Sequence, residues 1–133
     1  MKKLNTIQKR ANLNDVFAVG EPDISGAYHR FDIVPVWRRQ LDTDGSAISD
    51  FPEGLLLTVQ FQEGPRYEEA STPGVLDCDL LEIVRDRLTA FQSGMYACRE
   101  NACALTHIEE ALMWMNRRVE NRLDRGVLGT YKV

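Results

Sequence analysis

The chain has 133 residues, 44% of them hydrophobic and 27% charged, and a formal net charge of −4. This is the composition of a soluble globular protein with one domain, or with a small domain and an appended helical hairpin. It excludes the basic body needed to bind polymeric nucleic acid, and no apolar run approaches the roughly 18 residues of a membrane helix. We therefore expect a cytoplasmic protein, and a small anionic ligand stays open as a partner.

The N-terminal half predicts strands. Residues 1–13 are polar and predict a short helix or a loose arm. The segment 14–19 (NDVFAV) is a candidate strand, and 27–37 (AYHRFDIVPVW) and 55–62 (LLLTVQFQ) alternate between apolar and polar side chains as strands do. Residues 40–54 carry turn-forming side chains throughout.

Two short signals mark the connections in this half. Asp44 and Gly45 form the sharpest turn signal of the 40–54 segment. A polar loop at 64–74 is bounded by Gly-Pro and Pro-Gly and contains Arg66.

After residue 75 the apolar period changes to that of a helix. The first helix is expected to begin at Asp77, a natural N-cap, and to end at Gly94. Its apolar stripe consists of Leu80, Val84, Leu88 and Phe91. The second helix is expected to run from near Arg99 to about Arg125, where Gly126 stops it. A short connection makes the two helices antiparallel neighbours.

The predicted fold is therefore α+β, with an antiparallel β domain at 1–75 and a helical hairpin at 76–133. The second helix is longer by more than two turns, so its C-terminal part overhangs the first. This overhang carries four arginines: Arg117, Arg118, Arg122 and Arg125.

Met113 and Trp114 lie off the main apolar stripe of the second helix. Large apolar side chains in such positions predict a second buried surface. Two occupants fit it equally well, a second subunit or the β domain of the same chain.

The hairpin carries the side-chain types that bind a nucleotide. An aromatic ring such as Phe91 stacks on a base, an amide such as Asn101 reads its edge, and Arg118 and Arg122, four residues apart on one helix face, suit a diphosphate. The same residues also suit core packing, helix capping and a solvated surface. Arg99 is unfavourable at a helix N-terminus unless Glu100 or a bound anion offsets its charge.

Catalytic and metal-binding patterns are missing from the sequence. His29 and His107 are the only histidines, and there is no P-loop, serine elbow or dinucleotide fingerprint. The three cysteines, Cys78, Cys98 and Cys103, lack the spacing of a zinc site and fit reduced packing thiols. We expect no enzyme activity, no cofactor and no metal. A pure oligomerisation or protein-interaction module is the alternative to a ligand-binding protein.

The most idiosyncratic motif of the chain has the pattern FQ.G..ACREN..AL..IEEAL.W...R. Together with AYHRFDIVP and LTVQFQEGP, it resembles the phage Thoeris anti-defence sponge proteins, whose hairpin is of the same type as that of the phage anti-CBASS sponges. The resemblance covers residues 26–133 and is most specific over 76–130.

This resemblance implies a fold, a ligand and an assembly. Such proteins have a small β domain followed by a hairpin, assemble as dimers or hexamers, and sequester glycocyclic ADP-ribose without cleaving it. Some also bind cyclic di- or trinucleotides in separate pockets. If phage-encoded, the protein would act in the bacterial host cytoplasm.

The resemblance also assigns roles to residues. It implies Phe91 on the adenine, Asn101 reading the ligand, Arg118 and Arg122 on the phosphates, and Arg66 as a loop contact. Arg99 is the candidate for the second pocket. Tyr28 or Phe31 would be the aromatic contributed by the β domain.

Overall fold

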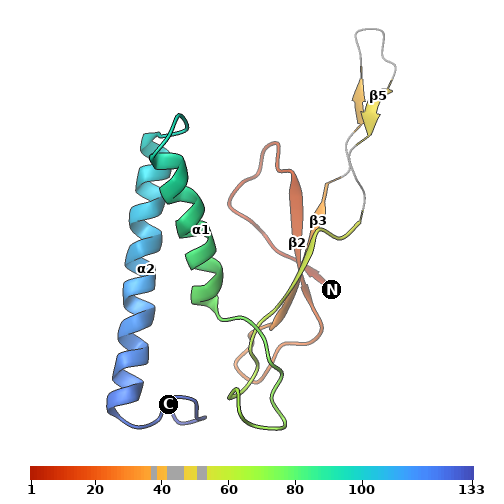
Figure 1. Cartoon of the computed structure of the whole chain (residues 1–133). Helices are drawn as coiled ribbons and strands as arrows, with labels where there is room; N and C mark the ends of the chain where they lie inside the picture. Colours follow the sequence, from red (N-terminus) through yellow and green to blue (C-terminus); the bar gives the residue numbers. More distant parts are fainter. Residues whose placement is uncertain (37–38, 42–46, 51–53) are drawn as a thin grey trace. The chain divides into compact units, whose positions relative to one another are not determined.

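The computed structural model describes residues 1–36, 39–41, 47–50 and 54–133 (Figure 1). Contacts divide the chain into two compact units, residues 1–60 and 61–133. Among the described residues, the strands belong to the first unit and the two helices to the second. An antiparallel sheet followed by a helical hairpin is an α+β fold, which confirms the predicted fold class.

The first unit is built on a four-stranded antiparallel sheet in the order β1-β2-β3-β6. Ala18 of β2 lies opposite Phe31 of β3, which lies opposite Val59 of β6. Directly paired residues of an antiparallel sheet share one face, so these three form an apolar row, in which Ala18 is fully buried. The four strands are β1 (Lys2–Lys3), β2 (Asn14–Val19), β3 (Arg30–Pro35) and β6 (Leu57–Gln60).

The first unit differs from the sequence-based expectation in two segments. The N-terminal arm contributes the short strand β1, which pairs with β2 and is not helical. The segment expected to be turn throughout, 40–54, overlaps β4 (Arg39–Leu41) and contains β5 (Ala47–Asp50), and the two strands pair as a separate two-stranded sheet. Strands this short have no long alternation of apolar and polar side chains, so they cannot be recognised among turn-forming residues. Asp44 and Gly45, the predicted turn, lie outside the described residues.

Asp23 organises the connection between β2 and β3. Its Oδ1 accepts hydrogen bonds from the Ser25 hydroxyl and from the backbone N–H groups of Ser25 and Ala27, at 2.8 and 3.2 Å for the two amides. Its Oδ2 lies 2.7 Å from Nε2 of His29. These bonds, above all those from Ser25 and His29, hold the pKa of Asp23 well below its usual range.

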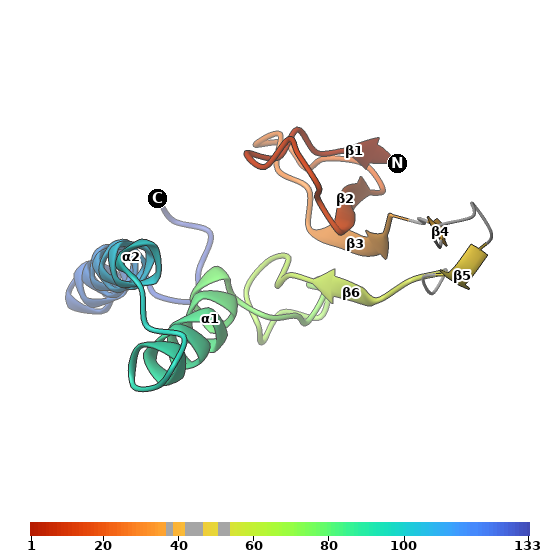
Figure 2. The same cartoon turned by 90° about the horizontal axis from the view of Figure 1, so that it is seen from above.

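The second unit is dominated by the helices α1 (Asp77–Gln92) and α2 (Arg99–Asp124), which lie side by side as an antiparallel hairpin (Figures 1 and 2). Between them, Nε of Arg85 donates to Oε2 of Glu109 at 3.0 Å. This bond and a second one to Glu82 raise the pKa of Arg85.

The helix ends agree with the prediction except at the start of α1. Asp77 was expected to be the N-cap, but it is the first helical residue and Leu76 occupies the cap position. The capping carboxylate belongs to Asp79, which accepts the backbone N–H of Leu76 at 2.8 Å. A carboxylate at the third helical position accepts the N–H of the cap residue, as in a capping box. The acidic first turn therefore caps the helix through Asp79, two residues after the predicted Asp77.

The chain turns back on itself after α2 (Figure 1). Gly126 has a φ of +68°, the left-handed conformation that ends a helix. The returning segment approaches the 61–75 loop, because a Cβ atom on Gly64 would lie 2.8 Å from the Tyr131 hydroxyl and 2.3 Å from Oγ of Ser71. Only glycine fits this close contact.

Few side chains of the described residues are buried. Ala18, Arg122 and Val127 are the ones that fall below one tenth exposure. Apolar residues on both helices stay open to solvent, among them Ile83, Met113 and Trp114. No described helix is long and apolar enough to cross a membrane.

Candidate functional site

Phe91 lies in the last turn of α1, where two side chains surround its half-buried ring. The ring of Tyr96 meets it edge-on, with centroids 6.2 Å apart and planes at 78°. The Arg87 guanidinium carbon lies 5.5 Å from the ring centroid. Sequence reasoning missed both partners, although Arg87 precedes Phe91 by four residues and so shares its helix face.

Asn101 lies in the first turn of α2, close to this aromatic pair. Its backbone N–H donates to Sγ of Cys98 at 3.4 Å, and its Nδ2 donates to the carbonyl oxygen of Tyr96 at 3.5 Å. Cys98 is the N-cap of the helix. Phe91 and Asn101 are therefore neighbours through Tyr96, and with Arg87 they form a group that we call the tip cluster.

Arg99 is the first residue of α2 and is exposed. Within the described part of the chain its side chain has no hydrogen bond or ion pair, so no carboxylate there is paired with it. A cation at the positive end of a helix is unfavourable by itself and favourable beside a bound anion.

Arg118 and Arg122 share a face of α2, but their surroundings differ. Arg118 is exposed and has no polar partner in the described residues. Arg122 is only 7% exposed, and its Nη2 donates to the carbonyl oxygens of Val127 at 2.9 Å and Thr130 at 3.1 Å. Arg118 is thus free to meet an anion, whereas Arg122 holds the turn that follows the helix.

Arg66 lies in the 61–75 loop, exposed, with two hydrogen bonds to its own loop. Its Nε donates to Oε1 of Gln62 and its Nη2 to the carbonyl oxygen of Gly74, both at 2.7 Å. The same Gln62 oxygen accepts the backbone N–H of Gly74 at 3.1 Å. These bonds close the base of the loop and fix where Arg66 stands.

The structure therefore brings together some predicted residues and separates others. Asn101 and Arg118 stand seventeen positions apart on one continuous helix, which is about 26 Å along its axis at 1.5 Å per residue. Phe91 belongs with Asn101 at the tip, and Arg122 belongs with Arg118 at the far end.

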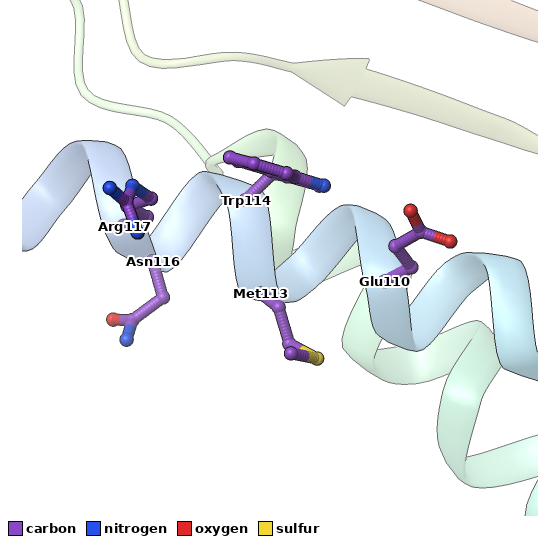
Figure 3. A pocket seen from close by; sticks show the side chains of 5 residues that line it. All are labelled: Glu110, Met113, Trp114, Asn116 and Arg117. Carbon is purple, nitrogen blue, oxygen red and sulfur yellow. The ribbon is translucent and has the colours of Figure 1, made fainter.

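A groove of about 600 Å³ runs along α2 itself (Figure 3). Met113 and Asn116 point to one side of the helix, and Glu110 and Trp114 to the other. The Arg117 guanidinium carbon lies 5.9 Å from the Trp114 ring centroid. The groove includes Met113 and Trp114, the two residues that the sequence placed off the apolar stripe, together with the polar side chains of Glu110, Asn116 and Arg117.

Asp23, Ser25 and His29 are the residue types of a hydrolytic triad, but their hydrogen bonds do not follow the order of such a triad. Asp23 stands between the other two and accepts the Ser25 hydroxyl proton. In a serine–histidine–aspartate triad the serine hydroxyl donates to the histidine, whereas here it donates to Asp23, so His29 is not placed to activate Ser25. No group of three or more histidine, cysteine or acidic residues in the described ranges is placed to hold a metal ion.

The hairpin is shared with known proteins. Residues 56–120 match the family described as Acb2/Tad1, hairpin domain. The protein Thoeris anti-defense 1 of Bacillus phage SBSphiJ7 is 48% identical over 85 residues, which are 64% of this chain and 58% of that relative. The chain thus matches somewhat more than half the length of this relative. These matches confirm the resemblance seen in the sequence: residues 56–120 match the Acb2/Tad1 hairpin domain, and the chain is similar to a phage Thoeris anti-defence protein.

Proposed function

We propose that this protein is a phage anti-defence sponge, which binds a cyclic nucleotide immune signal and holds it without cleaving it. The proposed ligand is glycocyclic ADP-ribose, the signal of Thoeris defence, and separate sites would take cyclic oligonucleotides of CBASS defence. The observation that carries this proposal is that the matched hairpin domain, residues 56–120, contains five of the six residues predicted to bind the ligand. The name of the phage relative supports the anti-defence role.

The tip cluster would hold the base. Adenine would stack on Phe91, and the Asn101 amide would hydrogen-bond to its edge. Arg87 covers Phe91 only through an exposed cation–π contact, which is worth about 0.5–1 kcal/mol. A base can displace it, because stacking on an aromatic side chain is worth about 1–3 kcal/mol.

The far end of α2 would hold the phosphates. Arg118 is exposed and unengaged, and Arg66 keeps its Nη1 without a described partner. Arg122 would not contact the ligand directly. To bind a phosphate it would have to give up its hydrogen bonds to two carbonyl oxygens in a buried place. We therefore place Arg118 and Arg66 on the ligand, and Arg122 as the residue that fixes the end of the helix. Arg99 remains the candidate for the second pocket.

A single chain cannot close this site around a small molecule. About 26 Å separate Asn101 from Arg118 along α2, so one pocket that uses both ends needs the tip of one subunit and the far end of another. The protein would therefore act as a homo-oligomer, either a dimer or a hexamer. Slow release, on which sequestration depends, favours a pocket closed by two chains.

Calorimetric titration with glycocyclic ADP-ribose tests the assignment. We expect Phe91→Ala to weaken binding roughly tenfold to a hundredfold, since stacking contributes about 1–3 kcal/mol, and Arg118→Ala to weaken it by a similar factor. Arg125→Ala, which removes an arginine from the same helix end, should bind as the wild type does. Unchanged affinity in both site variants would remove these residues from the site.

The same titration separates the sponge from the alternative function. No binding by the wild-type protein at micromolar concentration would favour a hairpin that only oligomerises or binds a protein partner.

A further inference from the structure

The face of α2 that carries the groove exposes two large apolar side chains. Met113 is 71% and Trp114 64% exposed. Large apolar patches that stay open on one chain mark surfaces that another molecule covers. The proposed pocket uses neither residue, so the ligand does not account for them.

Opposite charges flank this apolar centre. Glu110 and Arg117 are seven residues apart, two helical turns, and so lie on the same side of α2 as Trp114; together with Met113 they line one groove (Figure 3). Glu110 approaches only His107, at 3.9 Å, among the described residues. In the described ranges, the partner of the Arg117 guanidinium is the Trp114 ring. Both charges are therefore available to an outside partner.

We propose that this face binds the same face of a second copy, with the two α2 helices antiparallel about a twofold axis that passes between Met113 and Trp114. A twofold interface is self-complementary: if one residue contacts a second residue of the partner subunit, the second residue also contacts the first residue of the partner subunit. Glu110 then faces Arg117 of the partner subunit, and the pairing occurs twice. A parallel arrangement would oppose like charges at both positions. The charge pattern thus selects both the partner and its direction.

This inference rests on the self-association in the proposed function and deepens it by naming the surface. It does not depend on the ligand, because none of its four residues belongs to the proposed pocket. The rival occupant is the β domain of the same chain. The β domain would have to present a positive group to Glu110 and a negative group to Arg117. A second copy presents both by symmetry, through its own Arg117 and Glu110.

Charge reversal tests the interface by sedimentation equilibrium of the full chain. Glu110→Arg and Arg117→Glu should each weaken self-association at least tenfold, because each opposes like charges twice. Mixing the two variants in equal amounts should restore association, since one chain then carries two arginines and the other two glutamates. The double variant E110R/R117E should also associate with itself. Asp86→Arg, an exposed reversal on α1, should leave association unchanged.

The outcomes separate this inference from the proposed function. Single variants that associate as the wild type does, or that stay apart when mixed, would overturn the interface while self-association stands. That is also the result expected if the β domain covers this face. A monomeric wild-type chain would overturn self-association and this interface together. Titration of the wild type with glycocyclic ADP-ribose tests the ligand separately.

Discussion

Arg118 and Arg122 have the same side chain on the same helix face, yet the structure gives them different tasks. The guanidinium of Arg118 is exposed, and that of Arg122 lies buried against the carbonyl oxygens of Val127 and Thr130. A buried charged donor contributes to stability mainly because its removal leaves the acceptors unpaired. Binding and stability should therefore separate between the two arginines.

Replacement of each arginine by methionine measures this separation, because methionine keeps most of the stem and removes the donors. We expect Arg122→Met to lower the free energy of unfolding by about 2–3 kcal/mol, since two charge-assisted hydrogen bonds are lost. Arg118→Met should change it by less than about 0.5 kcal/mol, as exposed substitutions usually do. Urea denaturation measures both values. Equal stabilities of the two variants would contradict the structural role of Arg122.

Asp23 should make the sheet-bearing unit sensitive to acid. Its folded-state pKa is depressed below the ordinary value of 3.8, mainly by hydrogen bonds from Ser25 and His29. A depressed pKa contributes stability that is present above the unfolded-state pKa and is lost as the pH falls toward the folded-state pKa. The loss should therefore occur below about pH 4.

Comparison with Asp23→Asn isolates this effect from the other carboxylates. We expect the variant to melt at a lower temperature than the wild type at pH 7, and the difference to shrink as the pH is lowered to 3. Scanning calorimetry across this range gives the two melting temperatures. A difference that stays constant with pH would show that the Asp23 charge is not responsible.

The two helices could be predicted almost completely from the sequence. Their apolar period, the glycine after each and the acidic first turn of α1 are local signals, and local signals determine helix ends within a residue or two. The cap of α1 was misplaced because Asp77 and Asp79 are both suited to it, and only geometry shows that Asp79 reaches the Leu76 amide.

The burial of Arg122 could not be predicted in the same way. It depends on the chain reversing after Gly126 and returning its carbonyl oxygens to the helix, at residues five and eight positions later. A spacing of four on a helix predicts a shared face, but it does not predict which side chain the following turn covers. The strands β4 and β5 were missed for a related reason, since their pairing is not visible in so short a pattern.

Helix length was the most useful quantity for the candidate site. The 26 residues of α2 place the tip cluster and Arg118 at different ends of one rod. The sequence already placed Arg118 on the overhanging end of the second helix, and the structure added Arg87 and Tyr96 at the tip. A pocket shared between subunits follows from this length if both ends bind one ligand.

Exposure of apolar side chains over the described chain supports the same interpretation. Met113, Trp114 and Leu123 of α2 all exceed half of their full exposure. A helical hairpin is stable when its apolar surface is covered, so a second copy would complete both the hairpin and the pocket. Ligand capture would then depend on assembly.

The central claim is capture without chemistry, and the fate of the bound molecule tests it most directly. The protein is incubated with glycocyclic ADP-ribose, separated from free ligand, denatured by heat and analysed by mass spectrometry of the released small molecules. Capture without chemistry predicts that intact glycocyclic ADP-ribose returns in the amount that was bound. Recovery of a linearised or hydrolysed product would contradict it and make the protein an enzyme.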